Sequence, residues 1–436
     1  MKLWQKGEDI DQFFEKFTIG KDRELDLYLA KHDVVGSQAH AKMLGKVGLL
    51  SEKDAEQLVN GLEAIGKEVA AGTFAIEEGV EDVHSQIELM LTRDLGDLGK
   101  KIHMGRSRND QVITALKLFT REEIGWVARK MHTLFDLLLS KSEQYKHILM
   151  PGYTHMQVAM PSSFGLWFGA YAESMVDDLI VLKAAHEVTN KNPLGSAAGY
   201  GSSFPLDRDA TSREMYFAEP NFNVVYAQMT RGKMERTVAM AMASLAGTLS
   251  KLAMDVCLYS GQNFNFFKLP VQFTTGSSIM PHKHNPDGFE LLRGKTNQLQ
   301  ALPYEMTLIT SNLPSGYHRD LQQLKERFIP SFDELKDCLD IAALMIDGLE
   351  VQENILDEDR YDLLFTVELV NELVLSGMPF RDAYREVGRR VQTGEYQASK
   401  EVHHTHLGSI GDPGNDRIKE SFMRTYAYFA RLEGGK

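Results

Sequence analysis

Residues 236–260 read RTVAMAMASLAGTLSKLAMDVCLYS, and this stretch decides the fold class. Its large apolar side chains recur at alternating steps of four and three positions: Val238, Met242, Leu245, Leu249, Leu252 and Val256. This spacing forms a heptad seam on one side of an α-helix, and such a seam packs against neighbouring helices. The other sides carry mostly Ala, Met and Ser, and a helix without a charged face is buried nearly all round. The stretch therefore predicts the core of a helical bundle, which neighbouring subunits can share.

Four other long stretches have the composition of helices, and no series of alternating strands is present. Residues 110–147 and 162–190 contain no proline. Residues 286–312 are interrupted by Pro303 and residues 320–350 by Pro330, and proline kinks or breaks a helix. Short strands would have to lie in the first 110 residues or at 190–230. The fold class is therefore expected to be mainly α, with a central bundle of long helices.

The length of 436 residues suggests two or three domains, because it exceeds one ordinary core. We expect a mostly helical N-terminal domain at 1–105 and a central long-helix bundle at 106–356. From about Asp357 the helices become shorter and the charge denser, so a small C-terminal helical domain is expected at 357–436. Two Gly- and Ser-rich stretches, at residues 195–203 and 274–286, lie between long helices. Loops on a rigid helical scaffold usually carry the chemistry.

Composition also limits the partners and the location. A net charge of −13 argues against nucleic acid, which needs clustered Lys and Arg. No uninterrupted apolar run reaches the length of about 18 residues that spans a membrane, and the acidic N-terminus does not resemble a signal peptide. The two cysteines, Cys257 and Cys338, are typical of buried, reduced thiols. We expect a cytoplasmic protein without a membrane or nucleic-acid partner.

The loop at residues 276–286, GSSIMPHKHNP, has the composition of an anion site. Ser277 and Ser278 offer hydroxyl groups beside a flexible glycine, Lys283 offers a cation and Asn285 a neutral donor. Together they could wrap a carboxylate. An ordinary polar surface loop has the same residue types and is favoured on chemistry alone.

This loop resembles the GSSxMPxKxNP signature of the fumarase/aspartase superfamily, which includes fumarases, aspartases, adenylosuccinate lyases and argininosuccinate lyases. The resemblance implies a homotetramer with a core of about twenty helices and active sites built from three subunits. It implies that Ser277 is the base that removes the proton next to a carboxylate. Ser278, Lys283 and Asn285 would hold that carboxylate, and Glu290 falls on a further active-site position.

Three more segments resemble argininosuccinate lyases in particular, so that the likeness spans roughly residues 25–330. Residues 106–111 read RSRNDQ and place Arg108 and Asn109 at a helix start, which suits carboxylate binding or simply a capped surface helix. Residues 151–157 read PGYTHMQ and include Thr154 and His155. By resemblance Thr154 contacts substrate, and His155 is our candidate for the general acid, assisted by Glu290.

Residues 317–322 read YHRDLQ, followed by Lys325, and resemble the YNKDLQ segment of that family. Tyr317, Gln322 and Lys325 then fall on substrate-binding positions. GSQAHA at 36–41 and EDVH at 81–84 extend the likeness. His84, and Asp26, which aligns with a family acid, are also expected to bind substrate.

Several residues depart from the family pattern. Val158 and Met160 replace an arginine and a glutamine, and Asp22 stands where the family carries serine. Arg231 matches an SDRD segment, but its neighbours Thr230 and Gly232 do not. These changes affect the amino-acid end of the expected site and leave its fumarate end unchanged.

The expected function is β-elimination of argininosuccinate to arginine and fumarate, without cofactor or metal. The nearest alternative is another fumarate-releasing lyase of the superfamily, such as an adenylosuccinate lyase or an aspartase-like enzyme. A structural homologue like the lens crystallins related to this family is a second alternative. The histidines at 403, 404 and 406 (HHTH) could bind zinc, but solvated loop histidines are the favoured interpretation, because no acidic or Cys partner is nearby in sequence.

Overall fold

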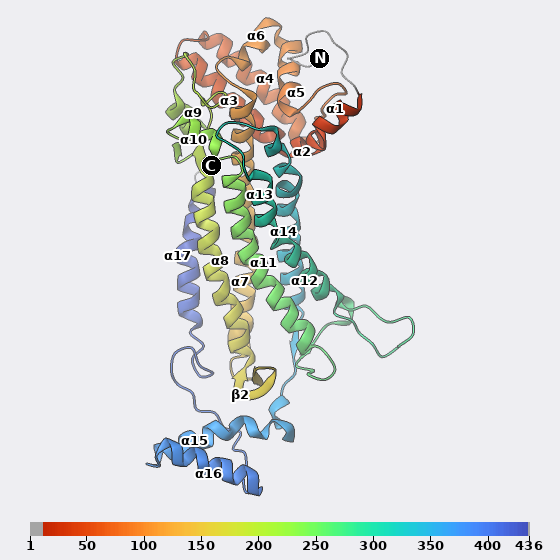
Figure 1. The fold of residues 1–436 in the computed structure, drawn as a ribbon, viewed down its shortest axis with the longest axis vertical. Coiled ribbons are helices and arrows are strands. Elements are labelled where there is room, and N and C mark those ends of the chain that lie inside the picture. Colours follow the sequence, from red (N-terminus) through yellow and green to blue (C-terminus); the bar gives the residue numbers. More distant parts are fainter. Residues whose placement is uncertain (1–11, 435–436) are drawn as a thin grey trace. The chain divides into compact units, whose positions relative to one another are not determined.

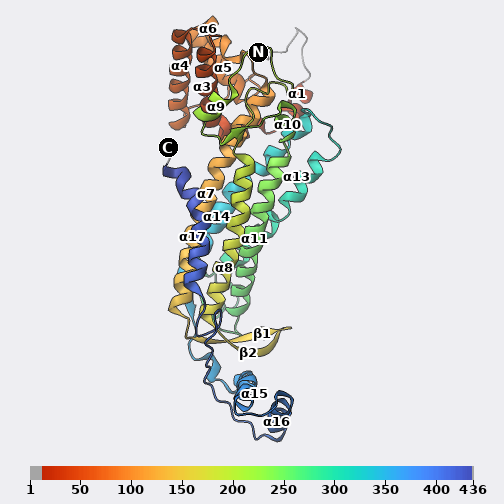
Figure 2. The same ribbon diagram turned by 90° about the vertical axis from the view of Figure 1, so that its left-hand side faces the viewer.

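The computed structural model describes residues 12–434, and α-helices dominate it (Figure 1, Figure 2). The described residues divide into two compact units, each assembled from three segments of the chain. Unit 1 runs to Val127 and also holds Val181–Ser244 and Gln298–Lys336. Unit 2 holds Ala128–Ile180, Leu245–Asn297 and the residues from Asp337 onward. The predicted division into three domains stays a prediction.

Five helices contain the boundaries between the units: α7 (Arg108–Gln144), α8 (Phe164–Thr189), α11 (Lys233–Tyr259), α12 (Asp287–Leu299) and α14 (Leu324–Asp347). They correspond to the long helices expected from the sequence, which confirms the mainly α fold. On α11 every residue of the heptad seam is at most 2% exposed. By length and composition α11 is also the one helix within residues 12–434 that could cross a membrane, a test that the core helix of a globular protein passes as well.

Unit 1 is helical apart from one short pair of parallel strands. Its remaining elements are α1 (Gln12–Ile19), α2 (Asp22–Leu25), η1 (Asp26–Leu29), α3 (Ala30–Lys46), α4 (Glu52–Ala70), α5 (Val83–Leu95), α6 (Asp97–Lys100), η2 (Lys101–His103), β3 (Lys191–Asn192), α9 (Arg208–Glu214), β4 (Glu219–Pro220), α10 (Val224–Met229), α13 (Leu302–Thr310) and η4 (Arg319–Gln322). Its main apolar core lies between α3, α4 and α5, where Leu44, Leu58, Leu62 and Ile87 are buried. This core holds α5 and the segment before it in place, and that segment carries part of the site.

Unit 2 contains two antiparallel strand pairs and the C-terminal helices. Its remaining elements are β1 (Leu149–Thr154), β2 (Gln157–Ser163), β5 (Phe267–Lys268), η3 (Val271–Phe273), β6 (Glu350–Val351), η5 (Ile355–Asp357), η6 (Asp359–Phe365), α15 (Thr366–Leu375), α16 (Phe380–Thr393) and α17 (Asn415–Gly434). Helix α17 packs on α7: the rings of Phe422 and Phe135 stack with centroids 3.8 Å apart, and those of Tyr426 and His132 lie 4.3 Å apart.

The two prolines behave differently. Pro303 lies in the first turn of α13, so the predicted break after α12 is confirmed. The predicted interruption at Pro330 is wrong, because α14 continues through it. Pro330 is exposed, whereas Phe328, Ile329 and Phe332 are fully buried. The packing of these neighbours outweighs the one backbone hydrogen bond that the proline removes.

The β1–β2 hairpin was not expected from the sequence, which placed short strands only before residue 110 or at 190–230. Its turn consists of His155 and Met156, both with positive φ, at 53° and 60°. Two-residue hairpin turns of this conformation favour Asn and Gly. The usual sequence signal of the hairpin is therefore missing. Parallel strands β3 and β4 do lie within 190–230, as expected.

Candidate functional site

The start of α7 is fixed by Asp110, which is fully buried. One oxygen of its carboxylate accepts a hydrogen bond from the backbone N–H of Ser107, at 2.9 Å. The other accepts from the N–H groups of Gly195 and Ala197, at 3.0 and 2.9 Å. Burial raises the pKa of Asp110 to about 6, although these donors and Arg106 act in the opposite direction. Asp110 thus ties the RSRNDQ segment to the loop that follows β3.

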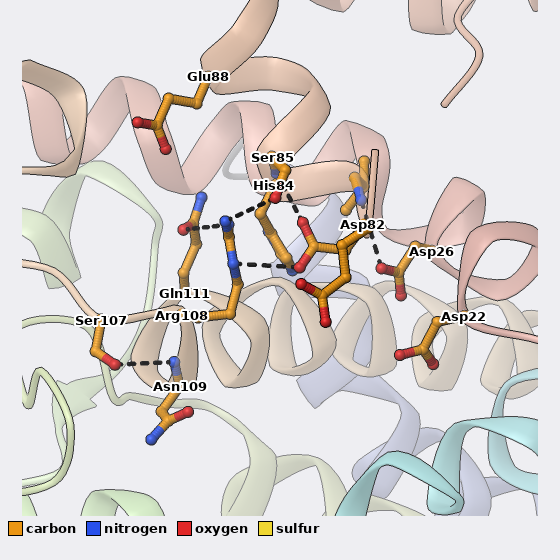
Figure 3. Close-up of polar contacts among 12 residues, drawn as sticks. Asp22, Asp26, Asp82, His84, Ser85, Glu88, Ser107, Arg108, Asn109 and Gln111 are labelled. Carbon is orange, nitrogen blue, oxygen red and sulfur yellow. Dashed lines mark hydrogen bonds and ion pairs between the residues drawn. The ribbon is translucent and has the colours of Figure 1, made fainter. Parts of the chain in front are cut away.

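Arg108 is held by partners within the protein (Figure 3). Its Nε lies 3.2 Å from the carboxylate of Asp82, and its other nitrogens donate to Ser85 Oγ and Gln111 Oε1 at 3.0 and 3.1 Å. Asp82 also caps α5 by accepting from the N–H of Ser85. Burial alone would raise the pKa of Asp82, but Arg108 and further contacts hold it below its usual value. A substrate carboxylate at Arg108 would share the guanidinium with Asp82.

Asn109 differs from its neighbour, because its side-chain amide makes no hydrogen bond to the described residues. Figure 3 shows this amide directed away from the guanidinium of Arg108. The residue is half-buried. Its amide is therefore a neutral donor and acceptor that remains available to a ligand.

His84 lies behind this segment with its side chain fully buried. Its Nδ1 is 2.9 Å from Asp33 Oδ1, and Asp33 also accepts from the side-chain amide of Gln111 at 3.0 Å. Burial works to raise the pKa of Asp33, yet His84, Arg106 and Gln111 hold it below its ordinary value. The sequence did not point to Asp33. In this position His84 orients Gln111 through Asp33, and a direct contact of His84 with substrate stays a prediction.

Lys325 lies between two carboxylates. Its Nζ is 2.8 Å from Asp22 Oδ1 and 2.7 Å from Asp26 Oδ1, and Asp26 also accepts from the N–H of Val83 at 3.5 Å. Burial works to lower the pKa of Lys325, but Asp26 and Asp22 raise it above the usual value. Burial raises the pKa of Asp22 to about 6, against the effect of Lys325. One lysine thus faces two carboxylates, so the group carries an excess of negative charge when both are ionised.

Gln322 and Tyr317 complete the residues predicted for unit 1. Gln322 donates from its amide to the carbonyl oxygens of Thr18 and Ile19, at 2.9 and 3.1 Å. The phenol of Tyr317 is 38% exposed and makes no polar contact within residues 12–434. Within the described residues, the side chains of Tyr317 and Asn109 therefore make no polar contact and are open to a ligand, whereas the amide nitrogen of Gln322 is already used.

The residues predicted for unit 2 lie on two separate segments. Thr154 and His155 are exposed at the turn of the β1–β2 hairpin. His155 adopts a positive φ without being glycine, and such strained positions persist where the surrounding fold imposes them. No hydrogen bond or ion pair in the described part of the chain joins this turn to the GSSIMPHKHNP loop.

The loop between α11 and α12 is closed at its base and open at its tip (Figure 1). At the base, Thr275 and Asn285 exchange backbone hydrogen bonds, and Thr275 Oγ1 contacts Asp287. Near the tip, Ser277 Oγ accepts from the N–H groups of Ile279 and Met280, at 3.3 and 3.1 Å. Donors aimed at an oxygen stabilise negative charge on it. These two donors would stabilise negative charge on Ser277 Oγ if the hydroxyl lost its proton.

The remaining predicted residues on this loop and on the start of α12 are mostly open to solvent. Ser278, Lys283 and Glu290 are exposed, and the described residues offer no ion pair to Lys283. Asn285 donates from its amide only to Thr275 Oγ1, at 3.4 Å. An ammonium, an amide and a hydroxyl on one loop can together bind a carboxylate.

The histidines at 403, 404 and 406 have other partners. His404 Nε2 lies 3.0 Å from Glu368 and His403 Nε2 lies 3.4 Å from Glu401. Among residues 12–434, no three His, Cys, Asp or Glu side chains are arranged to hold a metal ion.

Comparison with known proteins gives the same assignment as the motifs. The Lyase family matches residues 5–301. The argininosuccinate lyase of Bacteroides fragilis is 59% identical over 428 residues, covering 98% of this chain and 96% of the relative. That of Parabacteroides distasonis is 61% identical over 417 residues, covering 96% and 94%. This chain belongs to the argininosuccinate lyase family. A more distant member, from Thermotoga neapolitana, is 38% identical and covers 89% of this chain and 98% of its own length.

Solved structures support the fold of the family. An EDDS lyase in complex with formate has a TM-score of 0.74 at 20% identity, covering 98% of this chain and 92% of its own. A class II fumarase from Schistosoma mansoni has a TM-score of 0.71 at 19% identity, covering 87% and 88%. The chain therefore has the fold of the fumarase/aspartase superfamily. The predicted site residues of this chain fall into one group in unit 1 and two groups in unit 2.

Proposed function

We propose that this chain catalyses the reversible β-elimination of argininosuccinate to L-arginine and fumarate, the last step of arginine biosynthesis. The observation that carries the proposal is its identity of about 60% to argininosuccinate lyases along nearly the whole chain. The alternatives, an adenylosuccinate lyase or an aspartase-like enzyme, lack comparable support. A purely structural role has no need for the unpartnered Lys283 and the stabilised Ser277 oxygen.

In the proposed reaction, Ser277 Oγ takes a proton from the carbon next to a substrate carboxylate. The electron pair left on that carbon moves into the carboxylate, and Lys283, Asn285 and the N–H of Ser278 stabilise the charge that develops there. The two backbone donors at Ser277 Oγ support its role as the base. Loss of water on closing of the loop would strengthen all these contacts.

The electron pair then forms the double bond of fumarate, and the C–N bond breaks. The departing guanidine takes up a proton and leaves as the guanidinium of arginine. We assign this proton to His155, assisted by Glu290, since His155 is exposed on the hairpin turn and has no partner in the described part of the chain. Asn109, Thr154, Tyr317 and Gln322 are proposed to bind the rest of the substrate. We propose that four further predicted residues act mainly by positioning these substrate-binding side chains: Arg108, Asp26, Lys325 and His84.

We further propose a cytoplasmic homotetramer whose active sites are shared between subunits. Exposed apolar residues on α11 support a tetramer, because Met240 and Met254 are 51% and 45% exposed on a helix whose heptad seam is buried.

The first test is release of fumarate and arginine from argininosuccinate by the purified chain, with adenylosuccinate and aspartate as competing substrates. Fumarate from either competitor, with none from argininosuccinate, would replace the proposal by the alternative. Ser277→Ala should lower kcat by about 10²–10⁴-fold without changing the melting temperature. Ser376→Ala, at the end of α15, is the matched control and should leave kcat unchanged. If Ser277→Ala keeps near-normal turnover, Ser277 is not the base.

A further inference from the structure

A cavity of about 280 Å³ lies in unit 1 where α10 meets α11. One wall consists of the end of α10, the turn after it and the first turn of α11. The other consists of the end of α13 and the loop at residues 311–318. Its lining includes Gln228, Arg231, Lys233, Arg236, Leu313 and Leu321. This volume is at the small end for ligand pockets, so a small metabolite fits and a nucleotide does not.

Three basic side chains and no acidic one line the cavity, although the chain as a whole carries a net charge of −13. Arg231 is neutralised: its Nε donates to Glu235 Oε1 at 3.0 Å, and another of its nitrogens donates to the carbonyl of Leu321 at 2.8 Å. Lys233 and Arg236 form no ion pair within residues 12–434, and Lys233 makes only a contact with the ring of Tyr226. Two uncompensated cations, one helical turn apart, therefore border the cavity.

Gln228 adds a buried hydrogen-bond acceptor to the wall of the cavity. It is 2% exposed, and its side-chain carbonyl oxygen has no hydrogen-bond partner in the described structure. Its amide nitrogen donates to Ser196 Oγ and to the carbonyl of Ala197, at 3.1 and 3.3 Å, which keeps the side chain in place. A buried acceptor without a partner calls for a donor from a ligand or a bound water.

We propose that this cavity binds a small hydroxydicarboxylate such as malate. Its two carboxylates neutralise Lys233 and Arg236, and its hydroxyl donates to Gln228. Leu313, Pro314 and Leu321 cover its short carbon chain. An amino group in place of the hydroxyl is less suitable, because an ammonium would repel the same two cations.

The ligand would also restrain the loop that carries Tyr317. Gly316 and Leu321 line the cavity, and each precedes a residue of the proposed substrate site, Tyr317 and Gln322. Occupation of the cavity would hold both walls together and so restrict the motion of Tyr317. This regulatory effect rests on the proposed function, whereas the binding itself does not.

The test measures L-malate binding to the full chain by calorimetry. The double variant Lys233→Gln/Arg236→Gln should weaken binding by about tenfold for each cation removed. The double variant Lys53→Gln/Arg385→Gln removes two exposed charges from α4 and α16 and is the matched control, which should bind as the unmodified chain does. Arg236→Lys should retain most of the affinity, because it keeps the charge.

Two comparisons identify the site and the ligand. Succinate lacks the hydroxyl and should bind roughly fivefold more weakly than malate, a preference that Gln228→Met should abolish. Lys283→Met should leave malate binding at the cavity intact, so a signal lost in that variant belongs to the GSSIMPHKHNP loop.

Equal binding of malate and succinate, or malate binding that survives in Lys233→Gln/Arg236→Gln, would overturn the proposal. Loss of the oligomer in that double variant without any effect on malate would instead assign the two cations to contacts with a second copy of the chain. Absence of argininosuccinate turnover by the unmodified chain would contradict the proposed function and leave this binding test unaffected.

Discussion

At the scale of single residues, the arrangement of Asp22, Lys325 and Asp26 separates this chain from the pattern of its family. Lys325 and Asp26 are 5% and 1% exposed at their side chains, and Asp22 is 15% exposed. A serine at position 22 would leave one carboxylate opposite one ammonium. The aspartate adds a second carboxylate, whose ionised form burial disfavours, as its pKa of about 6 indicates.

This arrangement predicts that Asp22→Asn keeps or raises the free energy of unfolding at pH 8. The folded chain holds a proton on Asp22 between pH 4 and 6 that the unfolded chain releases, so the contribution of Asp22 to stability falls as pH rises through that window. At pH 8 the variant avoids this loss, and Lys325 still pairs with Asp26. Thermal unfolding at pH 4 and pH 8 measures the difference.

Asp26→Asn is the contrasting variant. It removes the most buried partner of Lys325 and the acceptor of the Val83 N–H, so we expect a loss of about 2 kcal/mol at pH 8. If Asp22→Asn proves the more destabilising of the two at pH 8, the assignment of the surplus charge to Asp22 is wrong.

At the scale of elements, the contact between the end of α7 and the start of α8 depends on a missing side chain. A Cβ on Gly165 would lie 2.4 Å from the Cα of Lys146 and 2.7 Å from the carbonyl oxygen of Ser142. Ser142 Oγ in turn donates to the carbonyl of Gly165 at 2.7 Å. These neighbours are backbone atoms, which cannot move without displacing the helix.

We therefore predict that Gly165→Ala lowers the free energy of unfolding by about 3 kcal/mol through overpacking. Gly294→Ala in α12 is the matched control, since a Cβ there meets no atom within 4 Å. It should raise stability by about 0.5–1 kcal/mol, because alanine restricts the unfolded chain more than glycine does. Urea unfolding measures the free energy of unfolding of both variants. Similar midpoints for the two would contradict the prediction.

Pro330 gives a second prediction at this scale. The residue is exposed and lies inside α14, where it cannot donate to the carbonyl of Glu326. Pro330→Ala should restore that hydrogen bond and raise stability by about 1–3 kcal/mol. The melting temperature measures the effect. A lower value in the variant would mean that the proline supports the packing of Phe328 and Phe332.

At the scale of the whole molecule, the exposed side of α11 bears on assembly. Met240, Ser244, Lys251 and Met254 are exposed on the helix whose heptad seam is buried. Large apolar residues on the exposed side of a core helix indicate a surface that another copy covers. The proposed sharing of active sites makes this surface a condition for catalysis as well.

If the proposed tetramer uses this surface, Met240→Glu is expected to shift the chain to smaller species and to reduce turnover, because burial of the new carboxylate is unfavourable. Ala64→Glu places the same group on an exposed site of α4 and should change neither property. Sedimentation velocity at micromolar concentration measures the oligomeric state, and the fumarate assay measures turnover. Tetramers of unchanged stability in Met240→Glu would place the interface elsewhere.

The local sequence was sufficient for the long helices and for the break before Pro303, and it supplied the segments whose role in the chemistry stays a prediction. Helix formation and the spacing of a seam depend on near neighbours, which the sequence lists in order. The same reasoning failed at Pro330, where buried neighbours outweigh the proline, and at the β1–β2 hairpin, whose turn lacks the usual residues.

Only the tertiary structure decided which charged groups pair and which remain open. Lys325 meets Asp22 and Asp26 from about 300 positions away, and the cavity joins the start of α11 to a loop some 80 positions further on. Pairings over such distances depend on how whole helices pack, and no local pattern encodes that packing. The sequence alone therefore determined the kinds of side chain that the site contains, and the fold determined that Arg108 is occupied by Asp82 while Asn109 and Tyr317 stay free.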